Sequence, residues 1–218
     1  RLNPLKPLLP HQAFQYVYLF SLLCLFGFTY SFDSIMNNHY MSNFTHYAEP
    51  VQKYMRTEKY ITTTCMARWV ILPIIFTKES LFTTYLQISP MLMTGGFYLA
   101  FFFILSHNYD GVYQYNSENK SIGFLQRQVL TSSNVGGPWL SFLNGGLNYQ
   151  IEHHLFPRIS HCYYPFIAPY VREFCDKRNI RYKHFPTILE NIESCLKHLH
   201  SMGTVETPSG FYVKVKND

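Results

Sequence analysis

Three long apolar stretches mark the first half of the chain, at residues 14–32, 61–76 and 81–105. The first and third contain no charged residue, whereas Arg68 and Pro73 interrupt the second. A helix rises about 1.5 Å per residue, so the first stretch nearly spans and the third fully spans a hydrocarbon core of about 30 Å. The pattern therefore predicts membrane helices, and it predicts the third most firmly.

The second half, residues 106–218, has no long apolar run. Half of the 18 Lys and Arg residues follow Pro157, which places this half on the cytoplasmic side of a membrane. Apolar residues at helical spacing predict an amphipathic helix over 187–200, and we expect the tail from Ser201 to be frayed. Residues 1–13 contain three prolines and are expected to form a loop or linker.

These assignments restrict the topology. If residues 1–13 and 106–218 share the cytoplasmic side, the chain crosses the membrane an even number of times between them. The third stretch then pairs with either the first or the second, and Arg68 would cost the second about 2.5–3.5 kcal/mol at the bilayer centre. We expect an all-α membrane protein, with a transmembrane hairpin and an interfacial helix in residues 14–105 and a cytosolic helical cap in 106–218.

The composition agrees with a membrane-associated protein. Hydrophobic residues make up 47% of the 218, which excludes a disordered chain, and charged residues only 14% against about 25% in soluble domains. The net charge is +5, but no dense Lys/Arg run points to nucleic acid, and a lipid bilayer is the expected partner. The five cysteines are scattered among apolar neighbours and are expected to be reduced and mostly buried.

Candidate chemistry lies at two places, Ser106-His107-Asn108 after the third stretch and a histidine pair near residue 153. On a helix, Gln150 reaches the same side as His153 and His154, which point about 100° apart. The two imidazoles can then approach two neighbouring points, which suits two metal ions better than one closed zinc site. An adjacent pair of histidines is usually a surface feature, but a third histidine at the end of a membrane helix favours a metal site.

Glu152 and two glycines of the third stretch also have expected roles. Glu152 is predicted to accept a hydrogen bond that orients an imidazole. Gly95 and Gly96, inside the third stretch, either pack against another helix or line a tunnel for an acyl chain, and we favour packing.

Residues 150–157, with the sequence Gln-Ile-Glu-His-His-Leu-Phe-Pro, resemble the third histidine box of the membrane fatty acid desaturases. Gln in place of the first His is similar to the front-end group, the cytochrome b5-fusion desaturases of fatty acids or sphingoid bases. Ser106-His107-Asn108, residues 128–146 and Phe14-Gln15-Tyr16 also resemble that group. The resemblance covers nearly the whole chain, from just after the family's second histidine box.

The resemblance implies two iron ions held by His107, His153 and His154, with Gln150 in place of a ligand His. It also implies O₂ as oxidant, cytochrome b5 as electron donor, and a fatty acyl substrate carried by coenzyme A or a phospholipid. The location would be the endoplasmic reticulum membrane, multi-pass, with a cytosolic C-terminus.

The family's first two histidine boxes and its heme motif are absent from these residues. We therefore expect a C-terminal fragment that alone holds no stable diiron centre and is inactive. A sphingolipid desaturase, a related diiron hydroxylase and a catalytically inert membrane scaffold are the alternatives.

Overall fold

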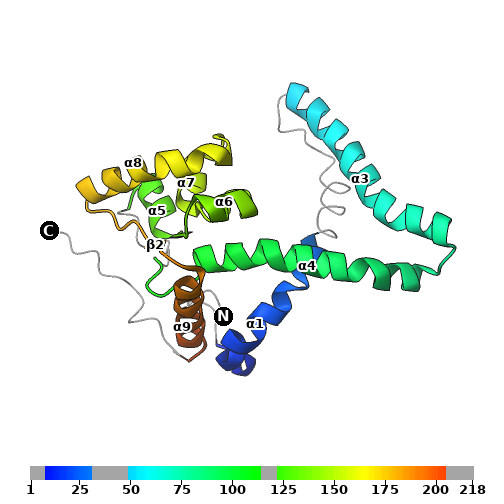
Figure 1. Cartoon of the computed structure of the whole chain (residues 1–218), viewed down its shortest axis with the longest axis horizontal. Coiled ribbons are helices and arrows are strands. Elements are labelled where there is room, and N and C mark those ends of the chain that lie inside the picture. The colour runs from blue at the N-terminus through cyan, green and yellow to red at the C-terminus, as the bar shows by residue number, and fades with distance from the viewer. Residues whose placement is uncertain (1–7, 31–48, 114–121, 205–218) are drawn as a thin grey trace. The chain divides into compact units, whose positions relative to one another are not determined.

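The computed structural model describes residues 8–30, 49–113 and 122–204, and these residues are mostly helical, as predicted. Figure 1 shows the elements along the chain. Their bounds are η1 Pro10–Phe14, α1 Gln15–Leu23, α3 Glu49–Thr77, α4 Leu81–His107, α5 Phe124–Leu130, β1 Asn134–Val135, α6 Pro138–Asn144, α7 Gln150–Leu155, η2 His161–Tyr163, α8 Tyr164–Lys177, β2 His184–Phe185 and α9 Ile188–Thr204.

Residue contacts divide the chain into two compact units. Unit 1 combines residues 1–19 with 101–218, and unit 2 holds residues 20–100. The candidate site lies entirely in unit 1, because the last turn of α4 belongs to that unit.

Helices α3 and α4 contain the second and third apolar stretches. Helix α4 begins at Leu81 as expected and ends two residues beyond the third stretch, at His107. Its apolar side chains are largely exposed, including Phe82, Leu86 and Met93. Among the described residues, α4 alone is long and apolar enough to cross a membrane. Helix α3 begins at Glu49, twelve residues before the apolar stretch, so its first turns are polar.

The first apolar stretch does not form one continuous helix. Helix α1 ends at Leu23, where the amides of Cys24 and Leu25 bond three residues back, to Ser21 and Leu22. Its nine residues rise about 14 Å, which is too short for a hydrocarbon core of about 30 Å. Helical backbone resumes at residues 26–30, so this stretch forms two helical segments, and both its crossing of the membrane and the transmembrane hairpin stay predictions.

The two glycines of α4, both in unit 2, differ in how closely other backbone approaches them. A Cβ atom built on Gly96 would overlap the backbone of Gly27, and one built on Gly27 would overlap the carbonyl of Leu92. A Cβ on Gly95 would meet nothing within 4 Å. Gly96 thus serves helix packing, as we favoured, because only a residue without a Cβ allows this approach.

Unit 1 is built around the short helix α7, which packs between α5 and α8 (Figure 1). Ile151 of α7 is fully buried with Val129 of α5 and with Val171 and Cys175 of α8. Strands β1 and β2 pair in parallel beside this layer, with Asn134 opposite His184. The all-α prediction therefore needs a small correction, since these two-residue strands join segments 50 residues apart.

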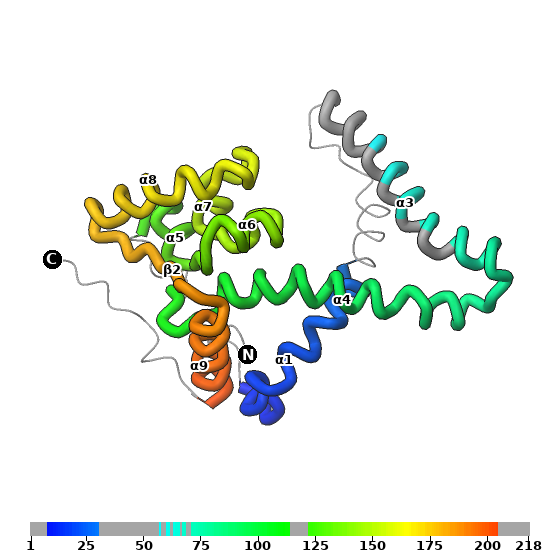
Figure 2. Tube along the Cα trace, viewed as in Figure 1, coloured from blue at the N-terminus to red at the C-terminus, as the bar shows by residue number. Residues whose placement is uncertain are grey.

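Helix α9 packs on η1, so the two ends of the described chain lie together (Figure 2). The Gln15 amide donates a hydrogen bond of 2.6 Å to the carbonyl of Leu199, and Tyr16 lies edge-on to His200. The predicted helix over 187–200 is confirmed and continues to Thr204. The expected fraying at Ser201 is wrong as far as residue 204, because Gly203 packs closely against Gln12.

The five cysteines are all free, as expected. Cys175 and Cys195 are buried, and burial raises the pKa of the Cys195 thiol to about 12. Cys65 and Cys162 are exposed, so the prediction of mostly buried thiols is wrong for these two.

Candidate functional site

His107 is the last residue of α4, and a short segment of chain holds it in place. The amide of Ser133 donates to the carbonyl of Ser106, at 2.9 Å, and ties this segment to the end of α4. His107 Nδ1 donates to the carbonyl of Thr131 at 3.0 Å. A proton on Nδ1 leaves a lone pair on Nε2, which is the form in which a neutral imidazole binds a metal.

His154 lies in the last turn of α7 and is held in the same way. Its Nδ1 donates to Oε1 of Gln128 on α5, at 2.9 Å. Burial, and then the neighbouring His107 and His153, lower the pKa of His154 to about 4. His154 is therefore neutral near pH 7, with its lone pair on Nε2.

Gln150 lies between these two imidazoles. Its Nε2 is 3.4 Å from His107 Nε2 and 3.2 Å from His154 Nε2, and the two rings are 5.0 Å apart. The two amide hydrogens can each donate to one ring nitrogen, which agrees with lone pairs on both Nε2 atoms. Three predicted site residues from α4 and α7 thus converge on one point.

His153 points to the neighbouring side of α7. It is exposed, and its Nδ1 is 3.3 Å from the hydroxyl of Tyr164, the first residue of α8. Its ring lies 6.0 Å from that of His154. The two histidines therefore face different directions, as their sequence positions require, and a metal-binding role for His153 stays a prediction.

Glu152 has a role different from the one we predicted. Its carboxylate is fully buried and accepts hydrogen bonds from Asn134 Nδ2 at 2.6 Å and from the Tyr182 hydroxyl at 2.8 Å. Asn134 also accepts the amide of Ile151 at 3.0 Å. The imidazoles are oriented by Thr131, Gln128 and Tyr164, so the assignment of Glu152 to that task is wrong.

The buried carboxylate has a shifted titration. Burial raises the pKa of Glu152, although the hydrogen bonds from Tyr182 and Asn134 act against this shift. Burial, and then the nearby Glu152, raise the pKa of Tyr182 as well. This cluster ties α7 to β1 and to the segment before β2, and it fixes the direction in which the ligand side of α7 faces.

The donor set fits one edge of an iron site. Imidazole nitrogen suits iron, and the two Nε2 lone pairs face the same point. Among the described residues, however, no three His, Cys, Asp or Glu side chains gather closely enough to hold a metal ion. Two imidazoles and one amide therefore make a partial ligand set, which needs further ligands to become a closed site.

Sequence reasoning missed the groups that orient this set. Gln128 and Asn134 lie in the stretch that carried the family resemblance, but their contacts could not be read from it. Tyr164 and Tyr182 gave no signal, because tyrosines next to apolar residues are also common in protein cores and at membrane surfaces.

Comparison with known proteins identifies the family. A family model described as fatty acid desaturase matches residues 3–186, most of the chain. The chain therefore belongs to the fatty acid desaturase family. No solved structure gives a significant match.

Three curated relatives show which desaturases this chain resembles. The acyl-lipid (7-3)-desaturase of Diacronema lutheri is 52% identical over 141 residues, which are 63% of this chain and 31% of that protein. The enzyme of the same name from Rebecca salina is 50% identical over 146 residues, 64% and 32% of the two chains. The acyl-lipid (8-3)-desaturase of Physcomitrium patens is 28% identical over 207 residues, 90% and 42%. The chain spans less than half the length of these relatives.

Proposed function

We propose that this chain supplies the C-terminal part of a front-end acyl-lipid desaturase, including one edge of its iron site. The observation that carries this proposal is the convergence of His107, Gln150 and His154 from two helices, in a chain of the desaturase family. The relatives named above are all acyl-lipid desaturases, which supports a fatty acyl chain as substrate.

The residues of this chain would bind and orient rather than transfer protons. His107 and His154 offer neutral Nε2 atoms, and Gln150 can offer its amide oxygen in place of a ligand imidazole. His153 is proposed as a ligand on the neighbouring side of α7. When bound, iron supplies the O₂ activation that removing hydrogen from an unactivated acyl chain requires, since side-chain acids and bases cannot break such C–H bonds.

The remaining parts of the proposal follow from the family resemblance. Two iron ions would share the site, with further ligands outside the residues described here, and cytochrome b5 would deliver electrons. The exposed apolar length of α4 supports a membrane location, and we propose the endoplasmic reticulum with a cytosolic C-terminus. Two imidazoles converge among the described residues, and we propose that the chain alone holds no stable diiron centre.

A chimera tests the proposal. The aligned part of the Diacronema lutheri desaturase is replaced by the matching residues of this chain, and the chimera is expressed in yeast supplied with polyunsaturated acids. We expect mass spectrometry to show a new double bond on the carboxyl side of an existing one. His154→Ala should abolish the product, whereas His161→Ala, at an exposed histidine outside the site, should retain it.

Other products would change the assignment. A hydroxylated acid would indicate a diiron hydroxylase, and a new bond only in sphingoid bases would indicate a sphingolipid desaturase. A product that survives His154→Ala as well as His107→Ala would leave this chain as an inert scaffold.

A further inference from the structure

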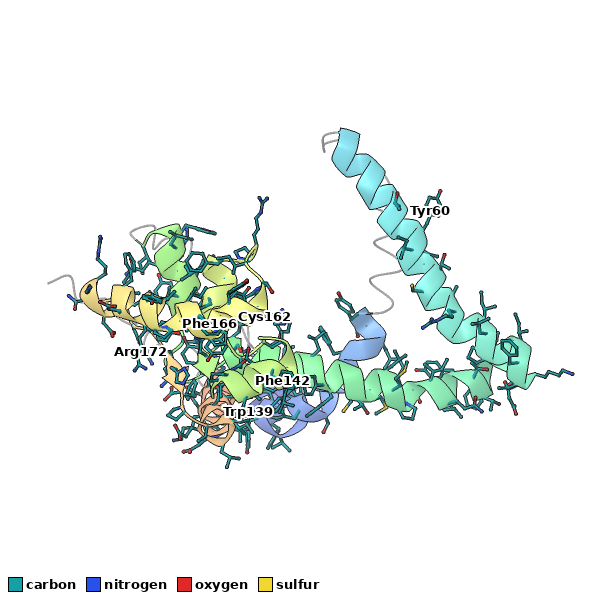
Figure 3. All side chains as sticks on the ribbon, turned by 45° about the horizontal axis from the view of Figure 1, so that its top comes forward. Tyr60, Trp139, Phe142, Cys162, Phe166 and Arg172 are labelled. Atoms are coloured by element: carbon teal, nitrogen blue, oxygen red, sulfur yellow. The ribbon has the colours of Figure 1, made fainter. Side chains whose placement is uncertain are left out.

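Helix α6 presents an unusual surface for a segment facing water. Trp139, Phe142 and Leu143 are 83%, 80% and 69% exposed, and Figure 3 labels the first two on this helix. Residues 128–151, which include α6, contain no acidic, basic or histidine residue. Single exposed apolar side chains are ordinary, but several large ones on one uncharged helix mark an interaction surface.

The element packed against α6 extends this surface. Helix η2 contacts α6, and Tyr163 at the end of η2 is 60% exposed. Phe166, in the first turn of α8, is 71% exposed and is labelled in Figure 3. Arg158 and Arg172, on either side of them in sequence, are exposed as well. Exposed aromatic rings with arginines near them are typical of the membrane–water interface, where rings lie at headgroup level and cations meet anionic lipid.

The position of α6 along the chain points to the same partner. Ser133 is bonded to Ser106, in the last turn of the helix that is fit to cross a membrane. Pro138, the first residue of α6, lies five residue steps after Ser133, and at about 3.4 Å each these steps span at most about 17 Å. Helix α6 therefore begins close to the point at which α4 would leave the bilayer.

We propose that α6 lies in the membrane–water interface, with Trp139, Phe142 and Leu143 inserted between lipids. The anchor would act directly on the candidate site. Asn148, just before α7, donates to the carbonyls of Val135 and Gly137, on the chain that enters α6. An anchored α6 would thus set the depth of α7 relative to the lipid. This role does not depend on which reaction the site performs.

Tryptophan fluorescence tests this insertion. The chain has two tryptophans, so Trp69→Phe leaves Trp139 as the only reporter. The full chain is placed in nanodiscs whose lipids carry bromine either near the headgroup end or near the methyl end of the acyl chain. We expect Trp139 to lose most of its emission to bromine near the headgroups, to lose less to bromine near the methyl end, and to resist aqueous iodide.

A matched reporter provides the control. Leu189 on α9 is 76% exposed, close to the value for Trp139, but it lies beside Glu190. In the double variant without native tryptophan, Leu189→Trp should be quenched by iodide and not by brominated lipid.

Quenching of Trp139 by iodide, without quenching by brominated lipid, would overturn the proposal, because α6 would then face water. Resistance of Trp139 to both quenchers would also overturn it, since a protein surface would then cover α6.

Discussion

Helices α4 and α7 both carry candidate site residues, but different interactions stabilise them. Helix α4 is 27 residues long, has apolar side chains exposed over most of its length before Ala100, and contributes His107 at its end. Helix α7 has six residues, of which Gln150, Ile151 and Glu152 are buried, and its polar groups bond to other elements. A long apolar helix needs only lipid around it, whereas a short polar helix needs specific partners.

The largest loss of stability is expected when α7 loses its hydrogen bonds to other elements. Asn134→Leu removes the hydrogen bonds to Ile151 and Tyr182 and leaves the Glu152 carboxylate short of one donor. Each buried group left without its partner costs about 1–3 kcal/mol, so losing three bonds should cost about 3 kcal/mol or more and lower the melting temperature in detergent by about 6 °C or more.

Asn144→Leu is the matched control for this substitution. Asn144 is also buried, but neither of its amide atoms has a hydrogen-bond partner among the described residues. Replacing it should be neutral or stabilising, because no bond is lost. Equal destabilisation by both variants would show that the cluster around Glu152 does not hold α7.

Helix α4 should instead be sensitive to charge. Met93→Arg places a cation near the middle of the helix and should cost about 2.5–3.5 kcal/mol on membrane insertion. The fraction of chain that resists alkaline extraction from membranes measures this cost. Leu189→Arg on α9, at an exposed position next to Glu190 in the sequence, should leave extraction unchanged. If both variants insert equally well, α4 does not cross the bilayer.

A substitution at Gln128 tests whether iron binding depends on the hydrogen bond that orients the His154 imidazole. Gln128→Leu removes the acceptor for His154 Nδ1 and should lower iron retention in the chimera by about 10–100-fold, as loss of such partners does elsewhere. Gln126→Leu makes the same change two residues away on α5, facing an apolar cavity, and should retain iron. The measurement is iron bound after dialysis against a chelator. Similar loss in both variants would assign the effect to α5 as a whole.

The smallest effect is expected at the glycines of α4. Gly96→Ala drives a Cβ into the backbone of Gly27 and should destabilise the protein by about 1–3 kcal/mol. Gly95→Ala meets open space and should have little effect. Thermal unfolding in detergent compares the two. Unchanged stability in Gly96→Ala, together with a changed acyl-chain preference of the chimera, would restore the tunnel interpretation.

The sequence predicted the helices that are marked by a long, regular pattern of apolar residues. The charge-free run of residues 81–105 predicted α4, and apolar residues at helical spacing predicted α9. It also placed His107, Gln150, His153 and His154 as candidate ligands. The break after Leu23 was missed, because hydropathy reports burial and not the local hydrogen-bond pattern.

The orienting groups could not be predicted, for a physical reason. Asn134 and Tyr182 lie 18 and 30 residues from Glu152, and only the folded layer of α5, α7 and α8 brings such groups together. A helix of six residues is also too short to show a period. The sequence therefore indicated which residues belong to the site but not which atoms orient them.

The most direct test of the central claim is the iron content of the purified chimera with single histidine substitutions. The convergence of His107 and His154 predicts that His107→Ala and His154→Ala each lose iron, while His161→Ala keeps the full amount. Full iron content in both His107→Ala and His154→Ala would contradict the assignment of this site.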